Sequence, residues 1–192
     1  MLAFLSPPVP LIDTLENDVA LRTPKTNNGI TVVGAGNYFV AHDRIGPKVI
    51  ENLQSVYGDK VEVVELKDGG LGLLDVLRKQ ELLILVDACS LGGEPGKVDV
   101  FEFDDLPIPA GSGRGFTLHQ INPYEVLKVA RVLYTDQMPK RIYFVLIETG
   151  GLEDEAPPIS EERATKSVME LIETEGELLA DRSTPHDYGK RK

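Results

Sequence analysis

The sequence contains a single cysteine, Cys89, among its 192 residues. One cysteine excludes an intramolecular disulfide framework and any zinc site that needs several cysteines. Basic residues are also scarce, because 20 Lys and Arg stand against 31 Asp and Glu, which gives a formal net charge of −11. We therefore expect no nucleic-acid partner and no binding to anionic membranes, since both require a basic surface.

Long apolar runs are missing as well, and no segment approaches the ~20 apolar residues that a transmembrane helix needs. The first residues, MLAFLSPPVPLI, are apolar, but prolines interrupt them and no basic region precedes them. We do not interpret this stretch as a signal peptide. A hydrophobic content of 42% and a charged content of 27% are typical of a soluble globular domain. Together these features predict a cytoplasmic protein.

Three regions are expected along the chain: an N-terminal extension at 1–28, a regular domain at 29–180 and a flexible polar tail at 181–192. Within the domain, apolar patterns predict strands and helices in alternation. Strands are expected at 29–36, 61–66, 82–88, 97–103 and 141–148. Helices are expected at 45–57 with Gly58 as the stop, at 71–80, at 122–133, and at 157–180 with Ser160 as the cap.

This alternation predicts an α/β fold: a single domain with a mostly parallel, twisted sheet of about five strands and helices on both faces. One connection departs from the pattern. The link between the strands at 82–88 and 97–103 is too short for a crossover helix. We therefore expect these two strands to form an antiparallel pair at a sheet edge.

Polar residues follow the predicted strands at their carboxyl ends, where open α/β sheets place functional groups. Asn37 and Asp43 follow the first strand, Asp68–Gly69–Gly70 the second, and Asp87 ends the run LLILV. His119 lies just before a predicted helix. Two carboxylates and an imidazole suit a divalent metal with open coordination positions, such as nickel or zinc. The same residues also suit general acid–base catalysis without a metal.

Each candidate has a structural alternative. Asp87 can cap the following turn, Asp43 can be the N-cap of the next helix, and His119 can be a surface or capping residue. Cys89 is expected to be a small core residue. We expect Asp43, Asp87 and His119 to converge at one edge of one sheet, which favours a functional site over three separate structural roles.

A nucleotide site is the competing hypothesis, because the glycines of GAGN at 34–37 follow a strand and precede a helix. The third glycine of a GxGxxG fingerprint would fall at position 39, which is Phe39. The helix also begins late, so its N-terminus does not lie directly beneath the glycines as pyrophosphate binding requires. The fingerprint is therefore incomplete.

Four segments together resemble a known family. VVGAGNYFVAHDRIG, a strand followed by DGG, then LLILVDA and LHQINPYEVL are similar to the nickel–iron hydrogenase maturation endopeptidases. The resemblance extends from about Ile30 to about Leu171. It implies a cytoplasmic protease that removes the C-terminal peptide of a hydrogenase large-subunit precursor once nickel has been inserted.

The resemblance also implies roles for single residues. Asp43, Asp87 and His119 match the residues that hold the metal and serve catalysis, and Asn37 and the turn at 68–70 match positions near the cleft. The metal implied is the nickel of the substrate precursor, and zinc or cadmium can occupy the same ligands in vitro. We expect a monomer of the aspartic or metal-dependent type. A non-catalytic adaptor that binds a metalloprotein is a further alternative.

Three departures from the family pattern stand out. His42 replaces a second acidic residue, so that the local charge is reduced or His42 itself becomes a ligand. The turn is DGGLG where the family has DGGTxG, which changes the contacts available to substrate. Residues 1–28 are additional, because the first strand of the family lies close to the N-terminus.

Overall fold

The computed structural model describes residues 29–37, 43–66, 70–90, 92–106, 122–149 and 158–183. These residues form one five-stranded sheet of order β2-β1-β3-β5-β4. The strands are β1 (Ile30–Ala35), β2 (Glu62–Leu66), β3 (Leu82–Cys89), β4 (Val98–Glu102) and β5 (Arg141–Glu148). The helices are α1 (Ile45–Tyr57), α2 (Pro123–Leu133) and α3 (Pro158–Ser183). Four 3₁₀ helices are η2 (Gly58–Lys60), η3 (Gly70–Val76), η4 (Phe103–Asp105) and η5 (Thr135–Gln137).

The sheet is parallel except at one edge. β1 pairs in parallel with β2 and β3, β3 pairs in parallel with β5, and β4 runs antiparallel to β5. The predicted mostly parallel sheet with an antiparallel edge strand is therefore confirmed. The predicted partner of that edge strand is wrong, because β5 lies between β3 and β4. The segment that joins β3 to β4 therefore has to pass the end of β5.

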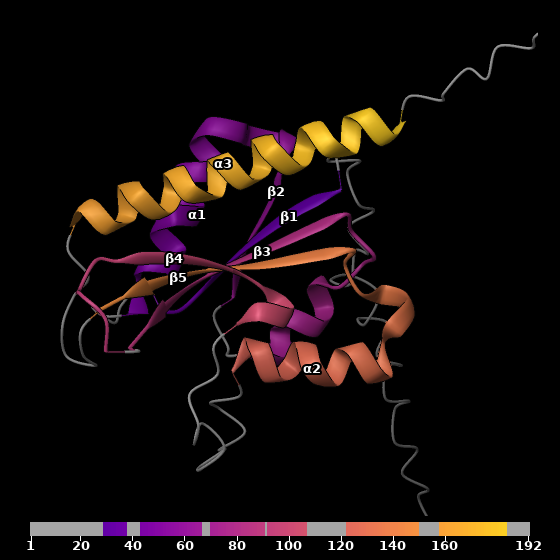
Figure 1. Ribbon diagram of the computed structural model, residues 1–192, viewed down its shortest axis with the longest axis horizontal. Helices are drawn as coiled ribbons and strands as arrows, with labels where there is room; N and C mark the ends of the chain where they lie inside the picture. Colours follow the sequence, from indigo (N-terminus) through magenta and orange to yellow (C-terminus); the bar gives the residue numbers. More distant parts are fainter. Residues whose placement is uncertain are drawn as a thin grey trace, which may run out of the picture.

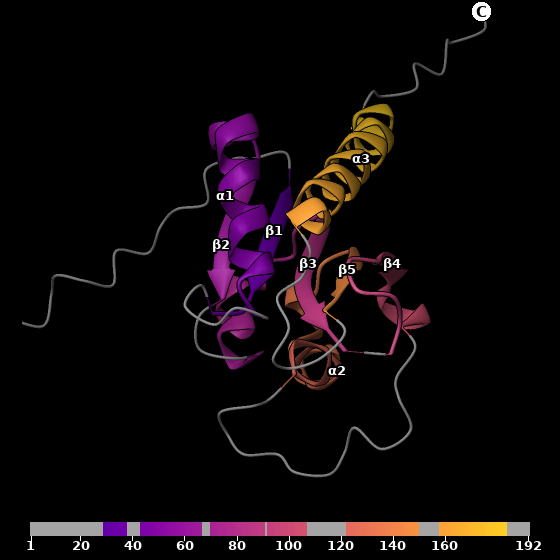
Figure 2. The same cartoon turned by 90° about the vertical axis from the view of Figure 1, so that its left-hand side faces the viewer.

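Helices cover both faces of the sheet, as predicted. α1 and α3 lie side by side on one face, and α2 lies beneath the other together with η3 (Figures 1 and 2). Strand alternation divides the core accordingly. Ile84 and Val86 of β3 pack in the cluster that includes α1 and α3. Leu83 and Leu85 pack in the cluster that includes α2 and η3.

Helix α1 packs unusually close to the sheet. A Cβ placed on Gly34 of β1 would lie 2.3 Å from Cγ1 of Ile50 and 2.5 Å from the carbonyl oxygen of Gly46. A Cβ on Gly46 would in turn lie 2.2 Å from the carbonyl oxygen of Ala35. Both glycines are needed because backbone meets backbone at this crossing. The helix ends at Gly58, as predicted, with φ of 53° in the left-handed region.

Two local predictions are wrong. The segment expected as a helix at 71–80 is the 3₁₀ helix η3, which ends at Val76. Ser160 is not a cap, because α3 begins two residues earlier at Pro158, where the fixed φ of proline suits a helix start. Ser160 is fully buried. Helix α3 runs to Ser183, three residues beyond its predicted end. The predicted extension at 1–28 lies outside the described residues.

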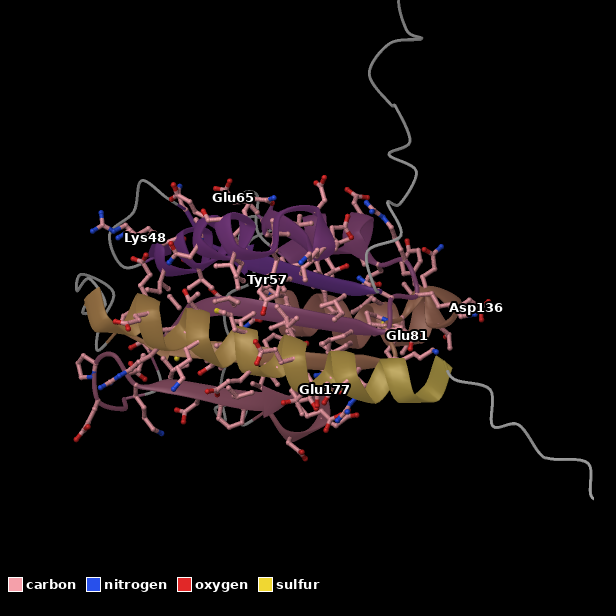
Figure 3. The ribbon with its side chains drawn as sticks, turned by 90° about the horizontal axis from the view of Figure 1, so that it is seen from above. Lys48, Tyr57, Glu65, Glu81, Asp136 and Glu177 are labelled. Atoms are coloured by element: carbon pink, nitrogen blue, oxygen red, sulfur yellow. The ribbon has the colours of Figure 1, made fainter. Side chains whose placement is uncertain are left out.

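The two ends of the sheet carry different residues. Lys48, in the first turn of α1, lies toward one end of the molecule, whereas Glu81 and Asp136 lie toward the other (Figure 3). The carboxyl ends of the parallel strands lie at the end where α1 begins, because β1 leads into α1. That end carries the residues considered next.

Candidate active site

Asp43 is held in place by a tight turn after β1. The backbone N–H of Asn37 donates to the carbonyl oxygen of Asp43 at 3.1 Å and to its Oδ2 at 2.9 Å. Gly36 makes the turn possible, since its φ is 128° and an added Cβ would lie 2.0 Å from the carbonyl oxygen of Asp43. The main chain of Asn37 thus holds Asp43 close to the end of β1.

The capping alternative for Asp43 does not hold. The N-cap of α1 is Arg44, which makes no side-chain capping hydrogen bond. The Asp43 carboxylate instead faces backward, toward the end of β1, where it meets the N–H of Asn37. The residue thus belongs to the edge of the sheet rather than to the helix that follows.

Asp87 lies within β3, one residue past the five aliphatic residues Leu82–Val86, which are almost fully buried. The pKa of the Asp87 carboxyl is raised to about 7, chiefly by burial and in addition by the neighbouring Asp43 carboxylate. A hydrogen bond from the backbone N–H of Ala88 opposes the rise in pKa. The capping role expected as an alternative is thus present in part, but burial and the second carboxylate dominate.

Asp43 and Asp87 therefore come together, as predicted. β1 and β3 are neighbours in the sheet, and the Asp43 carboxylate lies close enough to Asp87 to raise the pKa of that carboxyl. Alternation places Asp87 on the same face of β3 as Leu85, which is the face that α2 covers. Two like charges in a half-buried position repel each other unless a proton or a cation lies between them.

The structure describes only some of the other residues that were predicted to form the site. His119, Asp68 and Gly69 lie outside the described residues, as does His42. Gly70 is the first residue of η3 and is buried. Within the described ranges, no three His, Cys, Asp or Glu side chains gather closely enough to hold a metal.

Helix α2, which His119 precedes by four residues, has a well-defined start. Asn122 is its N-cap, and the Asn122 Oδ1 accepts a hydrogen bond of 2.8 Å from the N–H of Tyr124. Pro123 occupies the first helical position, where the fixed φ of proline suits a helix start. α2 covers the face of the sheet to which Asp87 belongs, and His119 shortly precedes this helix in the sequence.

Sequence reasoning missed a third carboxylate at the same end of the sheet. Glu148 ends β5, is only 3% exposed, and its Oε2 accepts a hydrogen bond of 3.2 Å from the N–H of Gly93. In register it lies beside Cys89 of β3, two residues past Asp87. The signal was available, because RIYFVLIE, like LLILVD, is an apolar strand that ends in an acidic residue. Cys89 itself is half-buried rather than a core residue.

The geometry of the GAGN turn opposes a nucleotide site. The space above Gly34 is filled by Ile50 and Gly46 of α1, and the space at Gly36 is filled by Asp43. In a dinucleotide site the glycines leave room for the pyrophosphate to approach the backbone. Here the glycines instead leave room for a helix and for a carboxylate.

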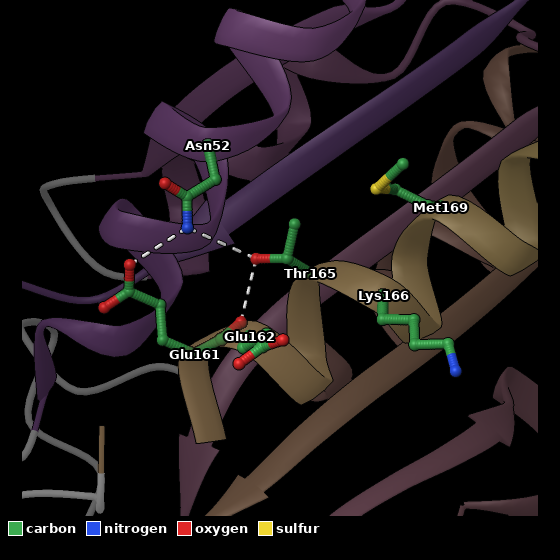
Figure 4. A pocket seen from close by; sticks show the side chains of 6 residues that line it. All are labelled: Asn52, Glu161, Glu162, Thr165, Lys166 and Met169. Carbon is green, nitrogen blue, oxygen red and sulfur yellow. Dashed lines mark hydrogen bonds between the residues drawn. The ribbon is translucent and has the colours of Figure 1, made fainter. Parts of the chain in front are cut away.

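A separate groove lies on the opposite face, between α1 and α3. It has a volume of about 440 Å³ and is lined by Asn52, Glu161, Glu162, Thr165, Lys166 and Met169 (Figure 4). Asn52 spans it, because its Nδ2 donates to Glu161 Oε1 at 2.9 Å and to Thr165 Oγ1 at 3.4 Å. These bonds join the two helices, and the groove contains none of the predicted site residues.

The fold and the paired carboxylates at its strand ends define a class. Residues 47–175 match the model of a family described as hydrogenase maturation protease, and the chain belongs to this family of peptidases. Two relatives illustrate the likeness. The hydrogenase expression/formation protein HupD of Bradyrhizobium diazoefficiens is 29% identical over 142 residues, which cover 73% of this chain and 72% of that protein. The hydrogenase 2 maturation protease of Escherichia coli K12 is 27% identical over 166 residues, covering 82% and 99%.

A solved structure agrees with this assignment. The hydrogenase maturating endopeptidase HybD from E. coli superposes with a TM-score of 0.62 at 26% identity, covering 77% of this chain and 93% of that one. The predicted family and fold class are thereby confirmed. In the described part of the chain, none of the helices combines the length and the apolar character needed to cross a membrane.

Proposed function

We propose that this protein is a cytoplasmic endopeptidase that removes the C-terminal extension of a nickel-loaded nickel–iron hydrogenase large-subunit precursor. Membership in the hydrogenase maturation protease family supports the reaction class. The observation that carries the proposal is the proximity of Asp43 and Asp87 at the carboxyl end of the sheet, with the pKa of Asp87 raised to about 7.

The carboxylate pair has a physical reason to seek a cation. In the free protein the two groups repel each other, and burial of Asp87 adds to the cost of its charge. A divalent ion presented by the precursor would remove both costs at once. Oxygen donors together with an imidazole suit nickel, so His119 is the third ligand that we propose. The nickel would belong to the substrate, and other divalent ions such as zinc or cadmium would compete for the site in vitro.

The proposed roles follow from this arrangement. Asp43, Asp87 and His119 would bind the nickel and thereby bring the scissile peptide to the site. A carboxyl with a pKa near neutrality suits a general base, so Asp87 is our candidate for activating water if the nickel only docks the substrate. If the nickel polarises the scissile carbonyl, Asp87 would act as a ligand. Asn37 and the turn at Asp68–Gly70 would contact the peptide.

The test is incubation of the protein with nickel-loaded and with nickel-free precursor, followed by intact-mass measurement. We expect loss of the C-terminal peptide from the nickel-loaded precursor only. An unchanged mass together with a stable complex would indicate the adaptor alternative. An unchanged mass without a complex would contradict the proposal altogether.

A further inference from the structure

The loop between β3 and β4 wraps around the end of β5, and Glu148 holds it there. Three hydrogen bonds connect them. Gly93 N–H donates to Glu148 Oε2 at 3.2 Å, Gly96 N–H donates to the Glu148 carbonyl at 2.7 Å, and Glu148 N–H donates to the Lys97 carbonyl at 2.9 Å. The loop passes here because β5 lies between the two strands that it joins.

This loop adjoins the candidate active site. It begins three residues after Asp87, and Glu148 lies beside Cys89 in the parallel register of β3 and β5. The next residue, Thr149, donates from its N–H at 3.0 Å and from its Oγ1 at 3.2 Å to the Cys89 carbonyl. These two bonds join the start of the loop to the end of β5, two residues after Asp87 in the sequence.

Within the loop, the Lys97 N–H donates to the Glu94 carbonyl at 3.0 Å and closes a turn. Gly92 and Gly96 have φ of 83° and 86°, and a Cβ on Gly92 would meet no atom within 4 Å. Residues 92–95 are exposed. Glycine-rich backbone has many accessible conformations, so the anchors that Glu148 supplies decide which conformation the loop presents beside Asp87.

We propose that Glu148 is a positioning residue, whose buried carboxylate holds the loop segment Gly92–Lys97, exposed at 92–95, in the conformation that contacts the precursor peptide next to Asp87. The exposed glycine backbone offers N–H and C=O groups to an extended peptide. The inference rests on the proposed function for the identity of the peptide. It adds a role for a residue that does not touch the reacting atoms.

The experiment compares Glu148→Ala with Glu148→Gln and with the matched control Glu175→Ala. Glu175 is also a buried glutamate, but it bonds Arg141 and Tyr143 away from the site. We expect Glu148→Ala to raise KM for nickel-loaded precursor about tenfold, with kcat changed less than twofold. A rise of this size is expected when one hydrogen bond is lost and the loop has to become ordered on binding. Glu148→Gln should restore KM, because its amide oxygen still accepts from Gly93. Glu175→Ala should lower the melting temperature without changing KM.

A folded Glu148→Ala protein with wild-type KM would overturn the proposal, as would a Gln variant that behaves like the Ala variant. If Glu148→Ala does not fold, Gly93→Pro removes the donor instead and should give the same rise in KM. Precursor that the wild type binds but does not cleave would count against the proposed function alone. In that case the dissociation constant for the precursor replaces KM, and Glu148→Ala should raise it about tenfold.

Discussion

The backbone N–H of Asn37 donates to both the carbonyl oxygen and the carboxylate of Asp43, at 3.1 and 2.9 Å. This pair of bonds holds Asp43 against Asn37 and directs the Asp43 carboxylate toward the end of β1. The GAGN stretch therefore positions a carboxylate. A side chain at Gly34 would collide with helix α1, and a side chain at Gly36 would collide with Asp43. Each glycine is therefore required for a different steric reason.

Replacing Gly36 by alanine should disrupt this turn. The new Cβ would lie 2.0 Å from the Asp43 carbonyl oxygen, and φ is 128°. We expect a loss of roughly 3 kcal/mol in the free energy of unfolding, since strain and a backbone clash add together. Processing should be lost even below the melting temperature, because Asp43 would be displaced. Urea denaturation and the precursor-cleavage assay measure the two effects.

Gly58→Ala is the matched control for that substitution. Gly58 also has a positive φ, of 53°, but a Cβ there would meet no atom within 4 Å. It should cost only about 1 kcal/mol and leave processing intact. Equal effects of the two substitutions on processing would refute the positioning role of Gly36.

The pH dependence of stability should reveal Asp87. Its pKa is raised to about 7 in the folded protein, against 3.8 for the unperturbed group. Between these pH values the folded state keeps a proton that the unfolded state has released. Stability from this group is therefore full below about pH 4 and is lost as pH rises through 7. Chemical denaturation of the free protein at a series of pH values measures the decline.

Asp87→Asn should separate stability from activity. A neutral amide avoids both burial of a charge and repulsion by Asp43, so the variant should be more stable than wild type at pH 8, by roughly 2–4 kcal/mol. Its stability should also vary less between pH 4 and 7. The variant should not process precursor. A loss of stability at pH 8 would mean that Asp87 is a structural residue.

Part of this site could be predicted from sequence because the signal is local. A carboxylate that directly follows five aliphatic residues has to lie at the end of a buried strand, and parallel strands end at a common edge. That reasoning brought Asp43 and Asp87 together correctly. Applied to the last strand, it would also have identified Glu148.

The errors concern features that nearby residues do not determine. β4 pairs with β5 rather than β3 because a strand distant in sequence inserts between them. η3 is a 3₁₀ segment although its apolar residues suit an α-helix, since Gly72 weakens helix formation and Lys79 has a left-handed φ of 58°. Ser160 has the residue type of a cap, yet it lies inside α3 and is fully buried.

Nucleotide titration should give no response. Because the backbone around Gly34 is covered by α1, we expect no change in melting temperature with NAD or ATP. A bound ligand at about 100 times its Kd would add ~2.7 kcal/mol of stability, which a thermal shift assay detects readily. A saturable rise in melting temperature would restore the nucleotide hypothesis.

Glu175 should matter for stability and not for the reaction. It is 6% exposed, bonds the guanidinium of Arg141, and accepts from Tyr143 Oη at 3.1 Å. Glu175→Ala leaves Arg141 without its buried partner, so we expect a loss of roughly 1–3 kcal/mol, less than for a fully buried pair because Arg141 is partly exposed. The rate of processing by the folded fraction should equal that of wild type. If the fully folded Glu175→Ala protein processed precursor more slowly than wild type, Glu175 would have a role in the reaction as well as in stability.

In the proposed reaction, the carboxylates of Asp43 and Asp87 act as one unit on the nickel of the precursor. The most direct measurement is the rate of processing of nickel-loaded precursor by Asp43→Asn, by Asp87→Asn and by the double variant, each shown to be folded. We predict that each single substitution lowers the rate of processing at least ~100-fold. The double variant should process precursor no more slowly than the slower of the two single variants, as expected for residues that act together. Processing at the wild-type rate by either single variant would contradict a joint role of the two carboxylates.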